Sequence, residues 1–301
     1  MAPTAPGWAA LALVFNGLVW GLSWWPFRQL QAQGLHPLWS TVLIYGPAVV
    51  IIIAFRPQSA SQLMRHKTLW LLALAAGVTN AAFNWACVIG DVVRVVLLFY
   101  LMPLWSALLA RWLLKEPMSR FAVVRMALAL AGAAIVLQPE GGSGWSLLPM
   151  PRSLAEWLGV LGGMGLALNN VLLKHQARQS QESRVLAMFI GGAVVSALVG
   201  TLLSSQGQVS WPLAGGVNSW PVWVWFLLGG LVLAFLCTNV ALQIGATHLP
   251  AQVTSVLMLS EVVFAAISST WMGAGHITVP LLIGGALIVL AAVWAARELP
   301  A

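Results

Sequence analysis

Long apolar runs separated by short polar breaks dominate this chain, and their lengths predict a bundle of membrane-spanning helices. Many runs approach about 20 residues, the length that a helix needs to cross the hydrocarbon core of a bilayer. Hydropathy and the charged or Pro/Gly-containing breaks together predict ten spans: 8–28, 37–55, 68–90, 93–114, 120–138, 154–174, 184–204, 221–245, 250–272 and 278–297. The expected fold class is therefore an all-α membrane protein.

The composition supports the same conclusion. Only 7% of the 301 residues are charged and 60% are hydrophobic, whereas a soluble domain carries roughly 25% charged residues. A lipid bilayer is therefore the expected surrounding. The net charge of +7 does not indicate nucleic acid, because the basic residues are scattered over short loops between apolar runs.

One loop has the character of a linker and divides the ten spans into five and five. It is "QPEGGSGWSLLPMPRS", which covers Gln138 to Ser153. We therefore expect a first five-helix repeat at residues 1–138, a linker loop at 139–153 and a second five-helix repeat at 154–301.

An internal repeat is visible when the chain is shifted by 159 positions without gaps. Asn80 then falls on Asn239, and Asn84 falls on Gln243. A pair of polar residues spaced four apart thus recurs within an apolar background, which favours duplication of one helical unit.

The loop charges indicate how the helices are oriented. With the N-terminus in the cytoplasm, eleven basic residues lie at cytoplasmic ends: Arg56, Arg65, Lys67, Arg111, Lys115, Arg120, Arg125, Lys174, Arg178, Arg184 and Arg297. Three lie outside: Arg28, Arg94 and Arg152. This is a strong positive-inside bias. Five spans per half then give the halves opposite orientations, an inverted-topology repeat with both termini cytoplasmic.

Three stretches resemble EamA-type repeats of the drug/metabolite transporter superfamily. They are "LMPLWSALLARWLLKEPMS" at Leu101–Ser119, "LSEVVFAAISSTWMGAGHIT" at Leu259–Thr278 and "NGLVWGLSWWPFR" at Asn16–Arg28. The resemblance implies a ten-helix basket around a central cavity. It also implies solute export by alternating access. The expected location is a bacterial inner membrane, and no cofactor is expected.

Glu261 is the only acid well inside a predicted span. Counting from Pro250 at about 1.5 Å per residue places it about 16 Å into the span, near the bilayer centre. An ionised carboxylate there costs at least about 2.5–3.5 kcal/mol, and no predicted span places Arg or Lys at that depth. Glu261 is therefore either a neutral acid bonded to a neighbouring helix, or a site for a substrate ammonium or a coupling proton.

Amides inside the spans are the next candidates for substrate contact. Asn80, Asn84, Asn239 and Gln243 can either join helices by hydrogen bonds or line the cavity at matched positions of the two halves. Asn169 stands beside another asparagine, and adjacent residues point in different directions, so at most one of the two is expected to face the cavity.

Aromatic and neighbouring residues complete the candidate substrate site. Most of the 17 tryptophans lie near span ends, where an interfacial belt explains them. Trp20, Trp24 and Tyr100 lie deeper, and they can stack on a planar or cationic solute. Thr254 and Met258 share a helix face with Glu261 and are expected to line the same cavity.

The predicted function is a secondary transporter that exports a small metabolite, namely an amino acid or an amine-like or aromatic solute, with Glu261 as the candidate site for proton coupling. A passive facilitator or channel is the alternative. The chain has no P-loop, no zinc-protease motif and no nucleophile elbow, which argues against ATP-driven transport and against an enzyme. No metal is expected, and both a monomer and a dimer remain open.

Overall fold

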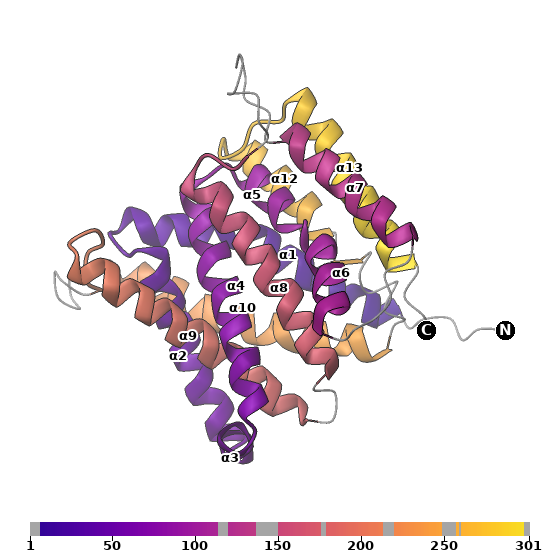
Figure 1. The fold of residues 1–301 in the computed structure, drawn as a ribbon. Helices are drawn as coiled ribbons and strands as arrows, with labels where there is room; N and C mark the ends of the chain where they lie inside the picture. Colours follow the sequence, from indigo (N-terminus) through magenta and orange to yellow (C-terminus); the bar gives the residue numbers. More distant parts are fainter. Residues whose placement is uncertain are drawn as a thin grey trace.

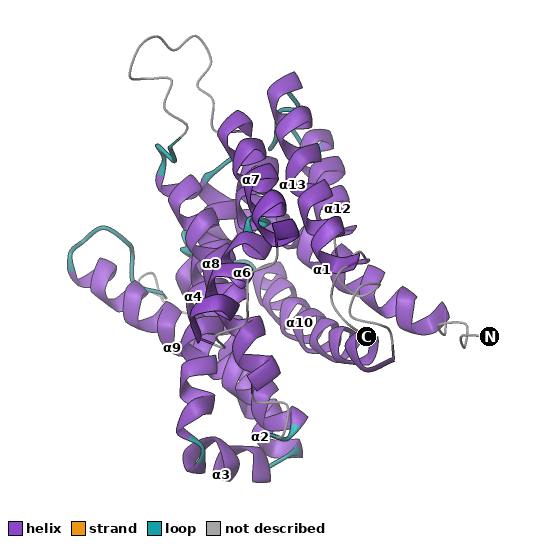
Figure 2. Ribbon diagram, turned by 45° about the vertical axis from the view of Figure 1, so that its right-hand side comes forward, coloured by secondary structure: helices purple, strands orange, loops and turns teal. Residues whose placement is uncertain are grey.

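The computed structural model describes residues 7–113, 120–136, 150–175, 179–212, 220–248, 257–258 and 260–297. Every regular element in these ranges is a helix (Figure 2). The helices are α1 (Gly7–Ala32), α2 (Pro37–Phe55), α3 (Gln58–Arg65), α4 (Lys67–Ile89), α5 (Val92–Phe99), α6 (Met102–Leu113), α7 (Arg120–Val136), α8 (Leu154–His175), α9 (Gln181–Ser205), α10 (Val222–His248), α12 (Ser260–Trp271) and α13 (Val279–Arg297). The expected all-helical fold is confirmed for this part of the chain.

Six of the described helices are long and apolar enough to cross a membrane, namely α1, α2, α4, α8, α9 and α10. Three shorter apolar stretches lie at Val92–Ser106, Met126–Val136 and Val279–Ala291. The chain is thus a multi-pass membrane protein. The count of ten spans and the inverted repeat stay predictions, and most of the expected linker lies outside the described residues.

The span expected at 93–114 is not one continuous helix. Helix α5 ends at Phe99 and α6 begins at Met102, with a turn at Tyr100 and Leu101. Pro103 has no N–H to donate to the carbonyl of Phe99 four residues earlier, so the α-helical hydrogen-bond ladder is interrupted at this point. Hydropathy misses the interruption because the residues on both sides are apolar.

Two further boundaries differ from expectation. The span expected at 250–272 is described as a helix only from Ser260, apart from residues 257–258. Helix α3 was not expected, because eight residues are too few to cross a bilayer. It buries Ser59 and Leu63 and leaves Met64 exposed.

The helices pack in groups that combine both halves of the chain. Helix α8 packs against α4, α5 and α6, whereas α1 packs against α10 and α12. Helix α9 joins α2 to α4. Helices α7 and α13 form a separate pair, side by side in both views (Figures 1 and 2).

Small residues allow the α7–α13 pair to pack backbone against backbone. A Cβ on Gly132 would lie 2.6 Å from the carbonyl oxygen of Gly284. Any larger side chain at Gly132 would therefore push the two helices apart.

Candidate functional site

A central cavity lies between the helix group around α8 and the helix group around α1. It encloses about 100 Å³, enough for several water molecules or a small organic group. Its walls come from α1, α2, α4, α5, α8, α9, α10, Met258 and α12. The lining residues are Asn16, Trp20, Tyr45, Ala76, Thr79, Asn80, Phe83, Phe99, Leu166, Asn169, Met188, Phe189, Phe235, Asn239, Leu242, Met258 and Glu261.

Two glycines of α1 bring α12 close enough to place Glu261 at this cavity. A Cβ on Gly21 would lie 2.8 Å from the carbonyl oxygen of Glu261, and one on Gly17 would lie 3.0 Å from its amide nitrogen. Such distances are too short for a real side chain. Glycine at both positions therefore lets the two backbones touch beside the carboxylate.

Glu261 is 7% exposed, and in the part of the chain that the structure describes one side chain forms a hydrogen bond to it. The Tyr100 hydroxyl lies 2.9 Å from Glu261 Oε2 and 3.0 Å from the carbonyl oxygen of Met258, so its single proton has two competing acceptors. Among the described residues Glu261 takes part in neither of the two ion pairs. Every other described lining residue is uncharged at neutral pH, so Glu261 sets the charge of the cavity.

Most amides and hydroxyls at the cavity are already bonded within the protein. Asn16 Nδ2 donates to the carbonyl oxygen and to Oγ1 of Thr238, at 3.0 and 2.8 Å. The Tyr45 hydroxyl donates to Asn80 Oδ1 at 2.7 Å. Thr79 donates to the backbone of its own helix. These hydrogen bonds hold the cavity walls in place. They leave the side chains little capacity to form hydrogen bonds with a solute.

Asn169 differs from these groups. It is 2% exposed, and its Oδ1 has no hydrogen-bond partner in the described structure. The adjacent Asn170 is exposed and donates from Nδ2 to Met102 Sδ at 3.4 Å. Of the two asparagines, Asn169 is a lining residue of the cavity and Asn170 is not.

Aromatic rings form the apolar wall of the cavity. The Trp20 ring lies 4.7 Å from Phe235 and 6.3 Å from Phe83, measured between centroids. Phe83 in turn lies 4.5 Å from Phe99. A flat apolar group would therefore meet ring faces and edges on two sides.

The structure brings six of the predicted site residues to the cavity: Trp20, Asn80, Asn169, Asn239, Met258 and Glu261. Tyr100 does not line it but bonds to Glu261. Thr254 lies outside the described residues. Gln243 belongs to α10, although its side chain is outside the description. Binding by any of these residues stays a prediction.

Two predicted site residues join helices and do not line the cavity. Asn84 Nδ2 donates to Thr41 Oγ1 at 3.1 Å, which links α4 to α2. Trp24 Nε1 donates to Ser268 Oγ at 3.0 Å, which links α1 to α12, and the guanidinium of Arg28 lies over its ring. Sequence position gave both residues a deep location but could not show which way each side chain points.

Sequence reasoning missed much of the aromatic lining, including Tyr45, Phe83, Phe99, Phe189 and Phe235. An aromatic residue in an apolar span carries no signal that separates a cavity wall from a lipid-facing surface. Only the packing of the helices distinguishes the two.

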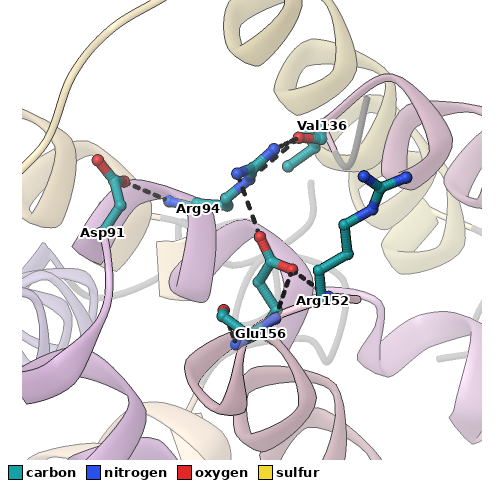
Figure 3. Close-up of polar contacts among 6 residues, drawn as sticks. Asp91, Arg94, Val136, Arg152 and Glu156 are labelled. Atoms are coloured by element: carbon teal, nitrogen blue, oxygen red, sulfur yellow. Dashed lines mark hydrogen bonds and ion pairs between the residues drawn. The ribbon is translucent and has the colours of Figure 1, made fainter. Parts of the chain in front are cut away.

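A second polar centre, the Arg94 cluster, contains Asp91, Arg94, Arg152 and Glu156 (Figure 3). The Arg94 guanidinium lies 3.1 Å from Glu156 Oε1 and also donates to the carbonyl oxygen of Val136. Glu156 Oε2 accepts the Arg152 N–H at 2.7 Å. The cluster thus ties α5 to the end of α7 and to the start of α8.

Glu156 also completes a capping box at the start of α8. Ser153 Oγ accepts the Glu156 N–H at 3.2 Å, while Glu156 Oε2 lies 3.4 Å from the Ser153 nitrogen. Asp91 connects the cluster to the loop before α13, because its Oδ2 accepts the His276 N–H at 3.0 Å. Arg28 donates to the neighbouring Gly90 carbonyl. The three basic residues predicted on the outer side therefore gather at one end of the molecule.

Comparison with known proteins supports a transporter. Residues 7–138 match the EamA-like transporter family, which confirms the expected resemblance for the first half and indicates a membrane transporter of the drug/metabolite type. No curated protein matches the sequence. A solved structure described as "Crystal structure of protein" shares 20% identity at a TM-score of 0.56, covering 96% of each chain. At this identity the likeness shows the fold alone.

Proposed function

We propose that this chain, whose first half is an EamA-like transporter segment, is a secondary transporter. It exports a small metabolite, an amino acid or an amine-like or aromatic solute, across a bacterial inner membrane. The observation that carries the proposal is the central cavity with one buried carboxylate and no basic partner for it among the described residues. A carboxylate in the membrane-embedded part of a helix bundle is expensive to keep and is typical of substrate or proton pathways.

The arrangement of the helices suits alternating access. The cavity takes residues both from the group around α8 and from the group around α1, and these groups meet where α12 packs against α5 and α1 packs against α4. Rocking of one group against the other would change which side of the membrane the cavity faces. The bond between Tyr100 on the α5–α6 turn and Glu261 on α12 crosses between these groups.

Glu261 is our candidate for the coupling site. A proton or a substrate ammonium on its carboxylate changes what Tyr100 can donate to, because the hydroxyl proton can turn to the Met258 carbonyl instead. Occupancy of the carboxylate would thereby alter a contact that links the two helix groups. This supplies a physical route from binding to conformational change.

Transport by purified protein in liposomes tests the proposal, with labelled tryptophan and labelled tryptamine as probes. Protein-free liposomes correct for leakage. We expect protein-dependent accumulation of at least one probe against its gradient when a proton gradient is imposed, with collapse on adding an uncoupler. Glu261→Gln should abolish this accumulation.

Two other outcomes would overturn parts of the proposal. Protein-dependent equilibration without accumulation would support the alternative, a passive facilitator. Unchanged accumulation and unchanged pH dependence in Glu261→Gln would remove Glu261 from the mechanism.

A further inference from the structure

Asn169, which lines the cavity, has an unused acceptor in addition to the carboxylate of Glu261. Within the described part of the chain its buried Oδ1 has no hydrogen-bond partner, whereas the other described amides of the cavity make bonds within the protein. A buried acceptor without a donor costs about 1–3 kcal/mol relative to a satisfied one. A donor on a bound solute would remove that cost.

Asn169 and Glu261 approach the cavity from different helices, and both of these helices pack against α5. Asn169 is on α8, which packs against α4, α5 and α6, while Glu261 is on α12, which packs against α1 and α5. A group that bonded to both would need at least two donors and would be favoured by a positive charge. A primary ammonium has three donors and one positive charge.

The described remainder of the lining offers no partner for a negative charge on the solute. The described lining holds neither Lys nor Arg. A carboxylate on the solute would therefore lose its water without gaining a cationic partner, and such burial is strongly unfavourable. The rings of Trp20, Phe83 and Phe235 instead suit a flat apolar body and stabilise a nearby cation.

We propose that the transported solute is a primary amine with a flat apolar body and no carboxylate, its ammonium held between Glu261 and Asn169 Oδ1. This inference rests on the proposed transport function and narrows its substrate class. It assigns Asn169 a role in specificity, and it ranks an amine above the amino acid that differs from it only by a carboxylate.

Matched ligand pairs test this ranking by isothermal titration calorimetry on the purified full-length protein. The probes are tryptamine with tryptophan, and 2-phenylethylamine with phenylalanine. Binding is measured here because it needs no correction for neutral amine that crosses lipid unaided, a correction that the protein-free liposomes supply for flux. We expect each amine to bind at least about tenfold more tightly than its amino acid, since the carboxylate would be buried unpaired.

Variants of the two neighbouring asparagines test the assigned contact. Asn169→Leu keeps a similar volume without the amide and should weaken tryptamine binding about tenfold or more, the range for a hydrogen bond to a charged group. Asn170→Leu is the matched control and should bind normally. Asn169→Ala replaces the leucine variant in the binding measurement if the leucine variant does not elute as a single species in size-exclusion chromatography.

The outcomes separate this inference from the proposed function. Tighter binding of the amino acids, or normal tryptamine binding in an Asn169 variant, overturns the amine assignment. If labelled tryptophan is still accumulated through Glu261, transport stands and only the substrate class is wrong. Absence of protein-dependent flux for both labelled probes overturns the transport function itself.

Discussion

Two buried carboxylates in this protein have opposite surroundings. Glu156 is 8% exposed and Glu261 is 7% exposed. Glu156 has an arginine, two backbone N–H groups and a capping serine around it, whereas among the described residues Glu261 has only a tyrosine hydroxyl. Burial alone therefore does not mark a functional acid. A carboxylate whose hydrogen bonds are satisfied holds the fold, and one left with free capacity can bind a solute or a proton.

The largest expected effect is on transport. Glu261→Gln should lower protein-dependent accumulation of the labelled probe by at least about tenfold, because loss of the charge removes the binding and coupling group. Glu156→Gln should retain more than about half of it, since this acid contacts only the Arg94 cluster and the start of α8. The liposome assay measures both variants side by side. Equal losses in the two would break the comparison.

A smaller effect is expected at Tyr100. Tyr100→Phe removes one hydrogen bond to Glu261 but keeps the ring, and should reduce coupled transport about fivefold, or about 1 kcal/mol. Tyr45→Phe is the matched control, because it also loses a buried hydroxyl bond but one made to Asn80. The proton dependence of transport should change in the first variant and not in the second. A change in Tyr45→Phe alone would contradict the assignment.

Folding stability should respond in the reverse order, with a larger loss for a Glu156 variant than for a Glu261 variant. Glu156→Ala removes the capping box and the partner of Arg94, a loss of about 1–2 kcal/mol. Glu261→Gln should cost less, because an amide keeps the contact with Tyr100 and no buried ion pair is broken. Apparent melting temperatures in one detergent compare the variants. A larger drop for Glu261→Gln would assign that acid to the scaffold.

The smallest expected effect is a pH dependence of folding stability that comes from His36. It must be distinguished from any pH dependence that Glu261 causes. Burial lowers the pKa of His36, in the loop between α1 and α2, to about 4 from 6.5. The neutral ring is stabilised because His36 Nδ1 accepts the Leu38 N–H at 3.3 Å. The unfolded chain binds the proton more readily, so this contribution is complete above pH 6.5 and is lost as pH falls toward 4.

The change in melting temperature between pH 7.5 and pH 5 measures this contribution of His36 to stability. His36→Asn keeps a capping acceptor and should flatten the pH slope by a small amount. The same slope in both proteins would show that His36 does not contribute. Transport profiles of Glu261 variants are best measured in the His36→Asn background if the slope is flattened.

The sequence identified some of the residues that line the cavity and misassigned others, for a geometric reason. Glu261 was identified because a charge in an apolar run is visible along one dimension. Asn80 and Asn239 were identified from their matched positions, whereas Asn84 and Trp24, equally deep, turned out to bond to Thr41 and Ser268. A position along a helix gives depth, but the neighbours decide the direction in which a side chain is used.

Hydropathy, composition and loop charge were enough to predict a multi-pass helical membrane protein with one acid deep in its apolar part, and residues 7–138 match the EamA-like transporter family. Hydrophobicity and loop charge are properties of single segments, so they can be read without a fold. The tertiary structure decided the rest: the interruption at Tyr100, the aromatic walls, the free oxygen of Asn169 and the pairing of Glu156 but not Glu261. Each of these depends on contacts between residues far apart in the chain, which no local pattern specifies.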